Sequence, residues 1–393
     1  MKNKLMLLPL LAGFFVMGFG DIIGTVMNQV KAECASDAER ISWLMPIFAY
    51  VWFLVVSIPT GVLSGRIGRK NTVLVSLAVT VAAMIVPLFA SAERWYLYVI
   101  AFALVGIGNT IIQAALPALM SNVVEPSLLA SRISLGQFVK ALCAALTPVF
   151  VYLTATALGN WKLLFPLYGA LTVGAAIWLW LTKIPDERFQ TSQTPQTSQT
   201  SFSGCFAMLK EPYVAAMTAG ILFSVGADVG FSVAIPEYLK NVFKVDVNLA
   251  GMGPTVYFIA KTVAAFAGAV VFARISAAKC FPWCMGIGLA ATASLPFVST
   301  PFAFLAVVAF VALLTANSFG MCMSLAIERF PAKANEISSL MVMAIVGGGI
   351  VSAALGVAHS AFGQVGIVAT LGVCIAYLFG LGVFAASRRN LVK

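Results

Sequence analysis

The sequence predicts an all-α membrane protein of twelve transmembrane helices, arranged in two pseudo-symmetric six-helix bundles. Three observations lead to this fold class. Of the 393 residues, 61% are hydrophobic and only 10% are charged, the mean hydropathy is +0.98, and long apolar runs recur along the whole chain. A soluble domain usually carries about 25% charged residues. Each run is long enough to cross a hydrocarbon layer about 30 Å thick.

The apolar runs give the expected helices in order. The first run follows a short basic N-terminus and continues to about Val30. Because it contains Asp21 and lacks a small-residue cleavage site, we expect a retained first helix and not a signal peptide. The expected spans are 7–30, 42–64, 72–90, 95–122, 128–155, 161–182, 213–239, 249–274, 280–299, 302–326, 334–358 and 363–386.

A polar segment divides the chain after the sixth span. Residues 190–201 consist of Gln, Thr, Ser and one Pro, a low-complexity composition that cannot bury a core. We therefore expect residues 183–212 to form a mobile cytoplasmic linker. It would join an N-terminal bundle of residues 1–182 to a C-terminal bundle of residues 213–393.

The basic residues indicate an orientation in the membrane. The net charge is +10, but Lys and Arg lie between the apolar runs and not in one patch, so we expect no nucleic-acid partner. With the N-terminus inside, sixteen of the 24 lie on the cytoplasmic side and six outside, while Lys140 and Lys261 lie within spans. The positive-inside rule then predicts a multi-pass protein of the bacterial inner (plasma) membrane with both termini cytoplasmic. We expect it to be a monomer in the lipid bilayer.

Cysteine and histidine indicate neither a disulfide framework nor a metal site. Of seven cysteines, only Cys34 falls in an expected external loop. Cys280 and Cys284 are one helical turn apart without a histidine or second cysteine pair nearby, and His359 is the single histidine. The chain has no paired-carboxylate or nucleophile constellation either. We expect no metal, no cofactor and no enzymatic activity.

Four charged residues lie well inside expected spans: Asp21, Lys140, Asp228 and Lys261. A charge at the bilayer centre costs about 2.5–3.5 kcal/mol even on low estimates. Two interpretations stay open, namely salt bridges that only fix helix packing, and a pathway for protons or a charged substrate. Burial raises the pKa of a carboxyl group and a nearby ammonium lowers it, so a solute that displaces the ammonium would change the proton affinity. Asp21 and Asp228 are the candidate proton-coupling residues.

The two aspartates occupy corresponding places in the two halves. Asp21 lies in a Gly-Asp-Ile-Ile-Gly segment of span one and Asp228 in an Ala-Asp-Val-Gly segment of span seven. Ser134-Leu135 in span five likewise has a counterpart in Ser339-Leu340 in span eleven. Such weak internal symmetry is typical of parallel-repeat transporters.

Neutral polar residues accompany these charges. Asn109 and Gln113 are four residues apart, and Gln137 and Lys140 three, so each pair shares a helix face. Amide and ammonium groups can donate hydrogen bonds to a polyhydroxylated solute, although interhelical hydrogen bonds are an equal alternative. The candidate substrate-binding residues are Lys140, Gln137, Asn109, Gln113, Lys261, Asn28, Tyr257 and Asn317.

The loop after span two carries the clearest motif. Residues 61–70 read Gly-Val-Leu-Ser-Gly-Arg-Ile-Gly-Arg-Lys. This segment resembles the Gly-x-Leu-x-Asp-Arg-x-Gly-Arg-Lys loop of the major facilitator superfamily, with Gly65 in place of the acidic residue. The resemblance implies a gating loop between helices two and three, made by Gly61, Arg66, Gly68, Arg69 and Lys70.

Three further segments resemble helices five, seven and eleven of the fucose–proton symporter family, which also takes up glucose, galactose and N-acetylated sugars. They are Arg132–Lys140, Val225–Gly230 and Ser338–Gly349. The resemblance implies a proton or sugar contact at Asp21. It also implies a glutamate in helix four, where residues 112–117 have no carboxylate, and an asparagine in helix five, where the chain has Lys140.

The combined observations predict a proton-coupled secondary transporter that imports a sugar by alternating access. The lost helix-four carboxylate and the two lysines favour an acidic sugar such as a sialic acid. A neutral hexose, fucose or an N-acetyl sugar is the alternative if Asp21 and Asp228 neutralise both lysines. Efflux of drugs or metabolites would require a wider apolar cavity, which the polar amides disfavour. A sensor would carry a larger soluble domain than the linker provides.

Overall fold

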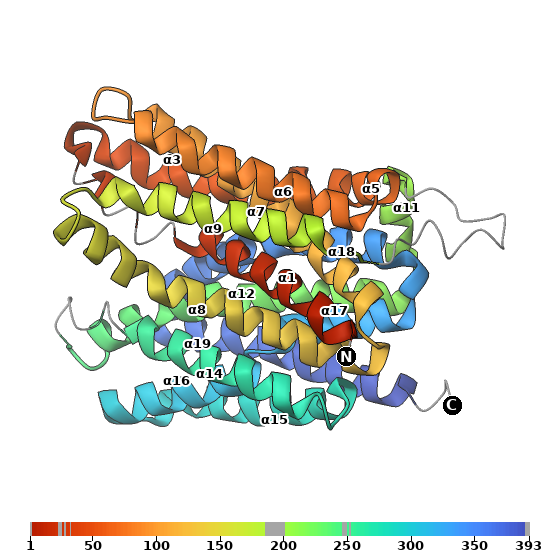
Figure 1. Ribbon diagram of the computed structural model, residues 1–393. Helices are drawn as coiled ribbons and strands as arrows, with labels where there is room; N and C mark the ends of the chain where they lie inside the picture. The colour runs from red at the N-terminus through yellow and green to blue at the C-terminus, as the bar shows by residue number, and fades with distance from the viewer. Residues whose placement is uncertain are drawn as a thin grey trace. The chain divides into compact units, whose positions relative to one another are not determined.

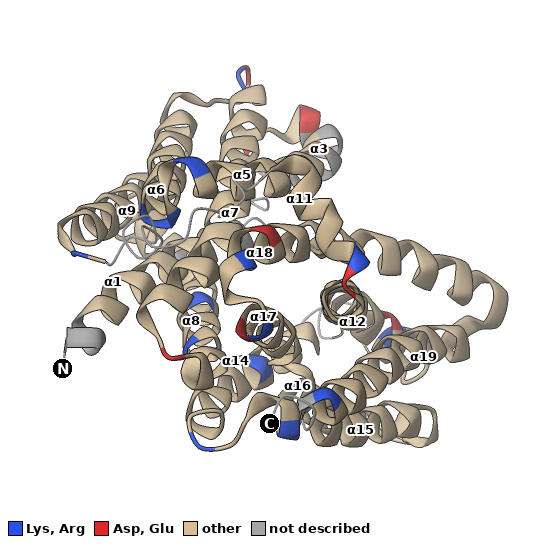
Figure 2. Cartoon of the chain, turned by 90° about the vertical axis from the view of Figure 1, so that its right-hand side faces the viewer, with Lys and Arg blue, Asp and Glu red and all other residues tan. Residues whose placement is uncertain are grey.

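Helices make up all the regular structure in the described part of the chain (Figure 1). The computed structural model describes residues 2–22, 26, 29–31, 33–184, 201–245, 250 and 253–389. A lipid environment offers no hydrogen-bond partners to the backbone, and a helix satisfies its own N–H and C=O groups. Charged residues are sparse along these helices (Figure 2). The predicted all-α membrane fold is confirmed.

The number of spans is close to the prediction. Nine helices among the described residues are long and apolar enough to cross a membrane, or ten if the pair Ile47–Val55 and Ser57–Ile67, bent by 56°, is one span. One of the nine, Pro331–Arg388, has 58 residues, enough for two crossings. It is interrupted at Gly363, whose φ of 59° and ψ of −141° are not helical. The exact number of twelve stays a prediction.

Several observed helix ends agree with the expected spans to within a few residues, whereas the first expected span, 7–30, meets the helix Lys2–Met17 and the 3₁₀ helix Gly18–Ile22. The run at 95–122 corresponds to α7, Tyr96–Val123, and the run at 161–182 to α9, Leu164–Leu181. Local signals set some of these ends. Helix α16, Pro301–Thr315, begins at a proline behind Thr300, whose hydroxyl accepts a hydrogen bond from the Ala303 N–H at 3.3 Å. Proline suits this first helical position because the N–H that it lacks would have no helical partner there.

The chain forms two compact units by its internal contacts. Unit 1 comprises Met1–Pro126, Gly136–Met208 and Pro331–Met343. Unit 2 comprises Ser127–Leu135, Leu209–Phe330 and Ala344–Lys393. The bundle boundaries expected from the sequence, 1–182 and 213–393, stay a prediction.

Unit 1 is built around α6 and α7. Helix α6 packs against both α7 and α9, and α3 packs against α7. The fully buried aromatic residues Tyr98, Phe102 and Tyr168 lie in this core. Its helices are α1 (Lys2–Met17), α3 (Ala38–Tyr50), α4 (Trp52–Val55), α5 (Ser57–Ile67), α6 (Arg69–Ile85), α7, most of α8 (Leu129–Thr156), α9, α11 (Phe202–Ala207) and α18 (Ala334–Met343).

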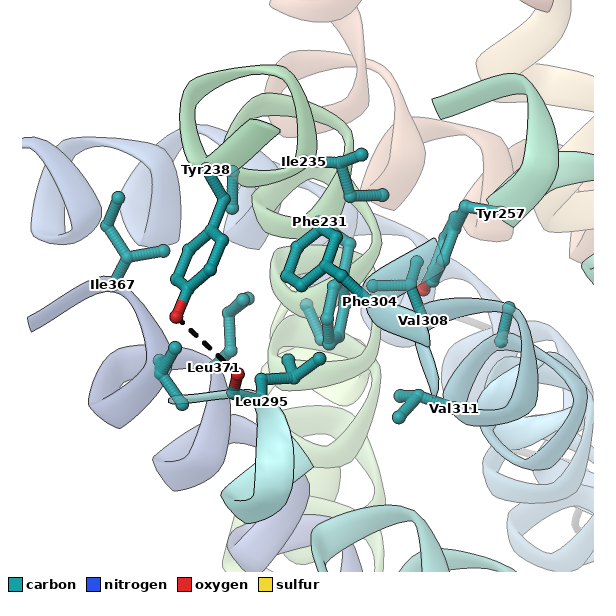
Figure 3. Close-up of a cluster of buried hydrophobic side chains, with 14 of the residues drawn as sticks. Phe231, Ile235, Tyr238, Tyr257, Leu295, Phe304, Val308, Val311, Ile367 and Leu371 are labelled. Atoms are coloured by element: carbon teal, nitrogen blue, oxygen red, sulfur yellow. Dashed lines mark hydrogen bonds between the residues drawn. The ribbon is translucent and has the colours of Figure 1, made fainter. Parts of the chain in front are cut away.

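Unit 2 is built around α12 and α19, which make the most extensive helix–helix contact in the chain. Figure 3 shows its apolar core, in which Phe231 and Tyr238 of α12 lie beside residues of α16 and α19. Its helices are the first part of α8, α12 (Pro212–Asn241), α14 (Gly253–Val271), α15 (Ala277–Ser294), α16, α17 (Ser318–Arg329) and α19 (Gly347–Arg389).

The C-terminal part of the expected linker is helical. Helix α11 begins behind Ser201, whose hydroxyl accepts a hydrogen bond from the Gly204 N–H at 3.0 Å. It packs against α5 and α18, with Cys205 fully buried. This segment differs from the expected mobile linker because its apolar side chains give it a face that can be buried. Most of the low-complexity core, residues 185–200, lies outside the described residues.

Docking of α11 predicts a protected thiol. Burial, reinforced by Glu336 and opposed by Lys333, raises the pKa of Cys205 to about 11, and the thiolate is the reactive form. We expect maleimide to label Cys205 at pH 7.5 more than about tenfold more slowly in the folded protein than after unfolding in detergent. Peptide mass spectrometry measures this rate.

The Ser201→Ala substitution removes the helix cap, which costs about 1 kcal/mol, and should accelerate labelling of Cys205. Ser203→Ala is the matched control, since Ser203 is exposed and its hydroxyl lies 3.3 Å from the Ser201 hydroxyl, whereas the capped Gly204 N–H donates to Ser201. Equal labelling rates in the folded and unfolded protein would contradict the docking of α11.

Candidate functional site

An ion pair at membrane depth joins two helices of unit 2. Helix α12 carries Asp228 near its middle, and α14 carries Tyr257 and Lys261, which share a face because they are four residues apart. The Tyr257 hydroxyl donates a hydrogen bond to Oδ1 of Asp228 at 2.9 Å. The Lys261 ammonium pairs with Oδ2 of the same carboxylate. We call these three residues the Asp228 centre.

The Asp228 centre is sealed on one side and partly open on the other. Tyr257 is fully buried, and its ring stacks on Phe231 with the ring centroids 5.2 Å apart. The side chains of Lys261 and Asp228 are 18% and 24% exposed. A charge pair in a medium of low polarity interacts strongly, but its removal from water costs several kcal/mol per ion. A partly open pair can therefore be separated by a ligand that solvates either partner.

Asn317 supports the helix that carries this centre. It lies at the break between α16 and α17, and its amide Nδ2 donates a hydrogen bond to the backbone carbonyl of Ala264 at 2.9 Å. Ala264 follows Lys261 by three residues in α14. A Cβ on Gly268, one turn further, would overlap the Asn317 side chain. The Asn317 amide thus holds α14 against the break between α16 and α17.

The Asn109 side chain and the backbone of Lys140 lie close to a short 3₁₀ helix, Gly18–Ile22, that follows α1. A Cβ on Gly20 would overlap the amide of Asn109, and a Cβ on Gly18 would lie 2.7 Å from the backbone oxygen of Lys140. Gln113 donates a hydrogen bond to Oδ1 of Asn109 at 3.3 Å, and both amides are buried. Glycine at these two positions lets α7 and α8 approach the 3₁₀ helix closely.

The remaining predicted residues are placed as follows. The backbone of Asp21 lies in the same 3₁₀ helix, and its side chain is outside the described part. Gln137 is partly buried on α8, one turn before Lys140, which is also partly buried. Asn28 lies outside the described residues. One site that unites the polar residues of unit 1 with the Asp228 centre stays a prediction.

The gating loop forms a tight connection within unit 1. Gly68 separates α5 from α6 with a φ of 91° and a ψ of 152°, a conformation that glycine adopts without strain. Arg66 is exposed, whereas Lys70 donates hydrogen bonds to the carbonyls of Trp180 and Thr182 at 2.9 and 2.8 Å. Lys70 therefore binds the last carbonyl groups of α9, where a helix is negatively polarised.

Arg69 is a buried charged residue of the loop, at 4% exposure. Its guanidinium donates to Oδ1 of Asn335 at 2.6 Å and to the Ala118 carbonyl at 2.9 Å, and it also contacts the amide of Asn122. The Arg69 side chain thus joins α6 to α7 and α18 through hydrogen bonds to two side-chain amides and a backbone carbonyl. In the same region, a Cβ on Gly61 would collide with the Ser339 hydroxyl, which explains glycine there. A pocket of about 50 Å³ lies beside Arg69 and Lys70.

Sequence reasoning missed several polar contacts of unit 1. Asn122 and Asn335 carry no charge, and nothing in the sequence pairs them with Arg69. It also missed the ion pair between Lys162 and Glu33, whose Nζ and Oε1 are 2.6 Å apart. The Tyr98 hydroxyl donates to the second oxygen of Glu33 at 2.9 Å. The one available signal was that Glu33 and Lys162 both flank apolar runs on the expected outer side.

No group of three or more His, Cys, Asp or Glu side chains that could hold a metal ion occurs in the described part of the chain. The charges of the Asp228 centre neutralise each other.

Removal of one charge from the pair should destabilise the protein more than removal of both. Asp228→Asn leaves the Lys261 ammonium without its carboxylate, and Lys261→Gln leaves the Asp228 carboxylate without its ammonium. Breaking a fully buried pair costs roughly 3–5 kcal/mol, and partial exposure reduces this to about 1–3 kcal/mol. In thermal unfolding in detergent, the double variant should be closer to wild type than either single variant. Additive losses in the double variant would contradict the pairing.

Comparison with protein-family models identifies one family. The sequence model of the Major Facilitator Superfamily matches residues 10–227. No curated protein sequence matches the chain at a significant level.

Solved structures share the fold at low sequence identity. The E. coli fucose:proton symporter is similar with a TM-score of 0.83 and 18% identity, covering 98% of this chain and 99% of that one. A bacterial homologue of the iron transporter ferroportin, in an outward-facing state, is similar with a TM-score of 0.76 and 12% identity, covering 98% of this chain and 100% of that one. A proton:xylose symporter is similar with a TM-score of 0.69 and 16% identity, covering 98% of this chain and 94% of that one. The chain belongs to the Major Facilitator Superfamily.

Proposed function

We propose that this protein is a proton-coupled secondary transporter that imports a sugar across the bacterial inner membrane. Transport would proceed by alternating access, with both termini in the cytoplasm and the protein acting as a monomer. Asp228 and Asp21 would carry protons, and the amides and lysines around them would contact the sugar. A transporter needs no bond-making chemistry, in keeping with a site that contains only exchangeable polar contacts.

The observation that carries this proposal is the Asp228 centre. A carboxylate and an ammonium lie at membrane depth, joined to each other and partly open. Charged residues inside membrane spans mark ion or substrate pathways by default because their cost is high. A buried carboxylate with a removable cation can bind a proton when the cation leaves. The centre therefore offers a direct physical link between a solute and a proton.

The comparisons support a sugar as the solute. Two of the structures that share this fold are those of fucose and xylose symporters, both coupled to protons. Segments of α8, α12, α18 and α19 also resemble the fucose–proton symporter family. Asn109 and Gln113 add amide groups next to the 3₁₀ helix of Asp21. Such groups suit hydroxyl-rich ligands better than the apolar drugs expected for an efflux protein.

The charge of the sugar depends on the two lysines. An acidic sugar, such as a sialic acid, is favoured by Lys140 and Lys261 together. A neutral hexose or N-acetyl sugar is the second candidate, and the pairing of Lys261 with Asp228 favours it, because that pair already has no net charge. Co-transport of one proton with a monoanionic sugar moves no net charge, whereas co-transport with a neutral sugar moves one positive charge.

Uptake into proteoliposomes tests the function and the substrate class together. With an imposed inward proton gradient, we expect at least one sugar from a panel of acidic and neutral sugars to accumulate inside the vesicles. A potassium–valinomycin clamp then varies the membrane potential. An acidic sugar should accumulate independently of the potential, and a neutral sugar should accumulate more at a negative interior. No gradient-driven accumulation of any sugar would contradict the proposed function.

A further inference from the structure

We propose that Tyr257 is a positioning residue that reserves one oxygen of Asp228 for the transported proton. The proposal rests on the proposed function, and it assigns Tyr257 a role different from direct contact with the sugar. The Tyr257 hydroxyl holds Oδ1, which leaves Oδ2 to be occupied in turn by the Lys261 ammonium or by a proton.

The geometry divides the two carboxylate oxygens between two donors. The Tyr257 hydroxyl donates to Oδ1 at 2.9 Å, and Lys261 pairs with Oδ2. The tyrosine ring is fixed, since it is fully buried and stacks on Phe231 at an interplanar angle of 23°. Lys261 has a flexible stem and is partly exposed. When a ligand engages the ammonium, Lys261 can move and Tyr257 cannot.

Burial also separates Tyr257 from any ligand. Its exposed fraction is 0%, compared with 24% for the Asp228 side chain. A sugar that approaches from the open side would reach Lys261 and Asp228 first, with the tyrosine ring behind them. Direct hydrogen bonding from the sugar to the Tyr257 hydroxyl would require the break of the bond to Asp228.

The exchange at Oδ2 balances in atoms and charge. In the empty centre, the carboxylate and the ammonium sum to zero. When an anionic oxygen of the sugar binds the ammonium, Oδ2 loses its cation, and a proton from the outer solution forms an O–H bond there. The neutral acid, the ammonium and the sugar anion again sum to zero. On the inner side, the proton leaves as the ammonium returns to Oδ2. Tyr257 keeps its own proton throughout and prevents the carboxylate from following Lys261.

The groups around the Asp228 centre come from four helices, since Thr315 of α16 forms a side-chain hydrogen bond with Tyr257. Helix α14 supplies Lys261 and Tyr257. Helix α19 places Val351 and Leu355 against Gly226 and Gly230, which flank Asp228 in α12. Helix α17 places Ser318 on Ser224, one turn before Asp228, with the hydroxyl oxygens 2.6 Å apart. The titratable Cys322 and Tyr377 contact Gly220 and Ala216, about two and three turns earlier.

The Tyr257→Phe substitution tests the assignment because it keeps the stacked ring and deletes only the hydroxyl. Tyr238→Phe is the matched control: Tyr238 lies in the same buried cluster, but its hydroxyl points to the Leu295 carbonyl at 3.5 Å (Figure 3). Two assays are compared in proteoliposomes. Gradient-driven accumulation requires the proton, whereas sugar exchange at equal pH on both sides does not.

We expect Tyr257→Phe to lower the accumulation ratio about tenfold, the order of effect of a lost hydrogen bond to a charged group, with the KM of exchange unchanged. Tyr238→Phe should behave as wild type in both assays. Combined with Asp228→Asn, which should itself abolish accumulation, Tyr257→Phe should add no further loss of accumulation.

Three results would overturn the assignment. A raised KM for exchange with intact accumulation would make Tyr257 a sugar ligand. Equal losses in Tyr257→Phe and Tyr238→Phe would indicate a general packing role, and wild-type accumulation in Tyr257→Phe would remove any role. Absence of accumulation by wild-type protein would instead reject the proposed function. Size-exclusion profiles of the variants identify any that do not fold.

Discussion

The charge pair between Asp228 and Lys261 is the constraint on which the rest of unit 2 depends. Two ions inside a membrane protein are tolerated only when they compensate each other, so α12 and α14 are held in register at this point. Two further hydrogen bonds hold α14 in place. Tyr257 of α14 donates to the Asp228 carboxylate, and Asn317 donates to a backbone carbonyl of α14. Apolar packing against α16 and α19 surrounds the polar centre and keeps its dielectric low.

Unit 1 also contains a buried cation. The guanidinium of Arg69 is buried against amides and a carbonyl, and Gly65 stands where the resembled loop carries an acid. Hydrogen bonds to amides hold a charge more weakly than an ion pair in the same place. Helix α11 also packs against α5 and α18 of this unit, and this contact buries Cys205. The segment that follows the low-complexity linker thus contributes packing as well as length.

The sequence predicted the fold well because the bilayer imposes a simple rule. Apolar runs predicted the long helices from α6 to α15 to within a few residues, but neither α11 nor the break between α16 and α17. The cost of buried charge singled out Asp228 and Lys261. The same rule could not tell which polar residues meet. Tyr257 and Asn317 stay predicted substrate-binding residues, and the sequence did not indicate that Tyr257 contacts Asp228 or that Asn317 contacts the α14 backbone. Asn122 and Asn335 were overlooked because an amide at a helix end carries no signal of its own.

The central claim is that the sugar and the proton are linked through Asp228. The most direct measurement is of proton movement driven by the sugar alone, in proteoliposomes loaded with a pH-sensitive dye and without any imposed gradient. External sugar should acidify the lumen in wild-type vesicles, and Asp228→Asn vesicles should take up sugar down its gradient without acidification. Sugar uptake by the wild type without proton movement, or equal acidification in the variant, would contradict the account.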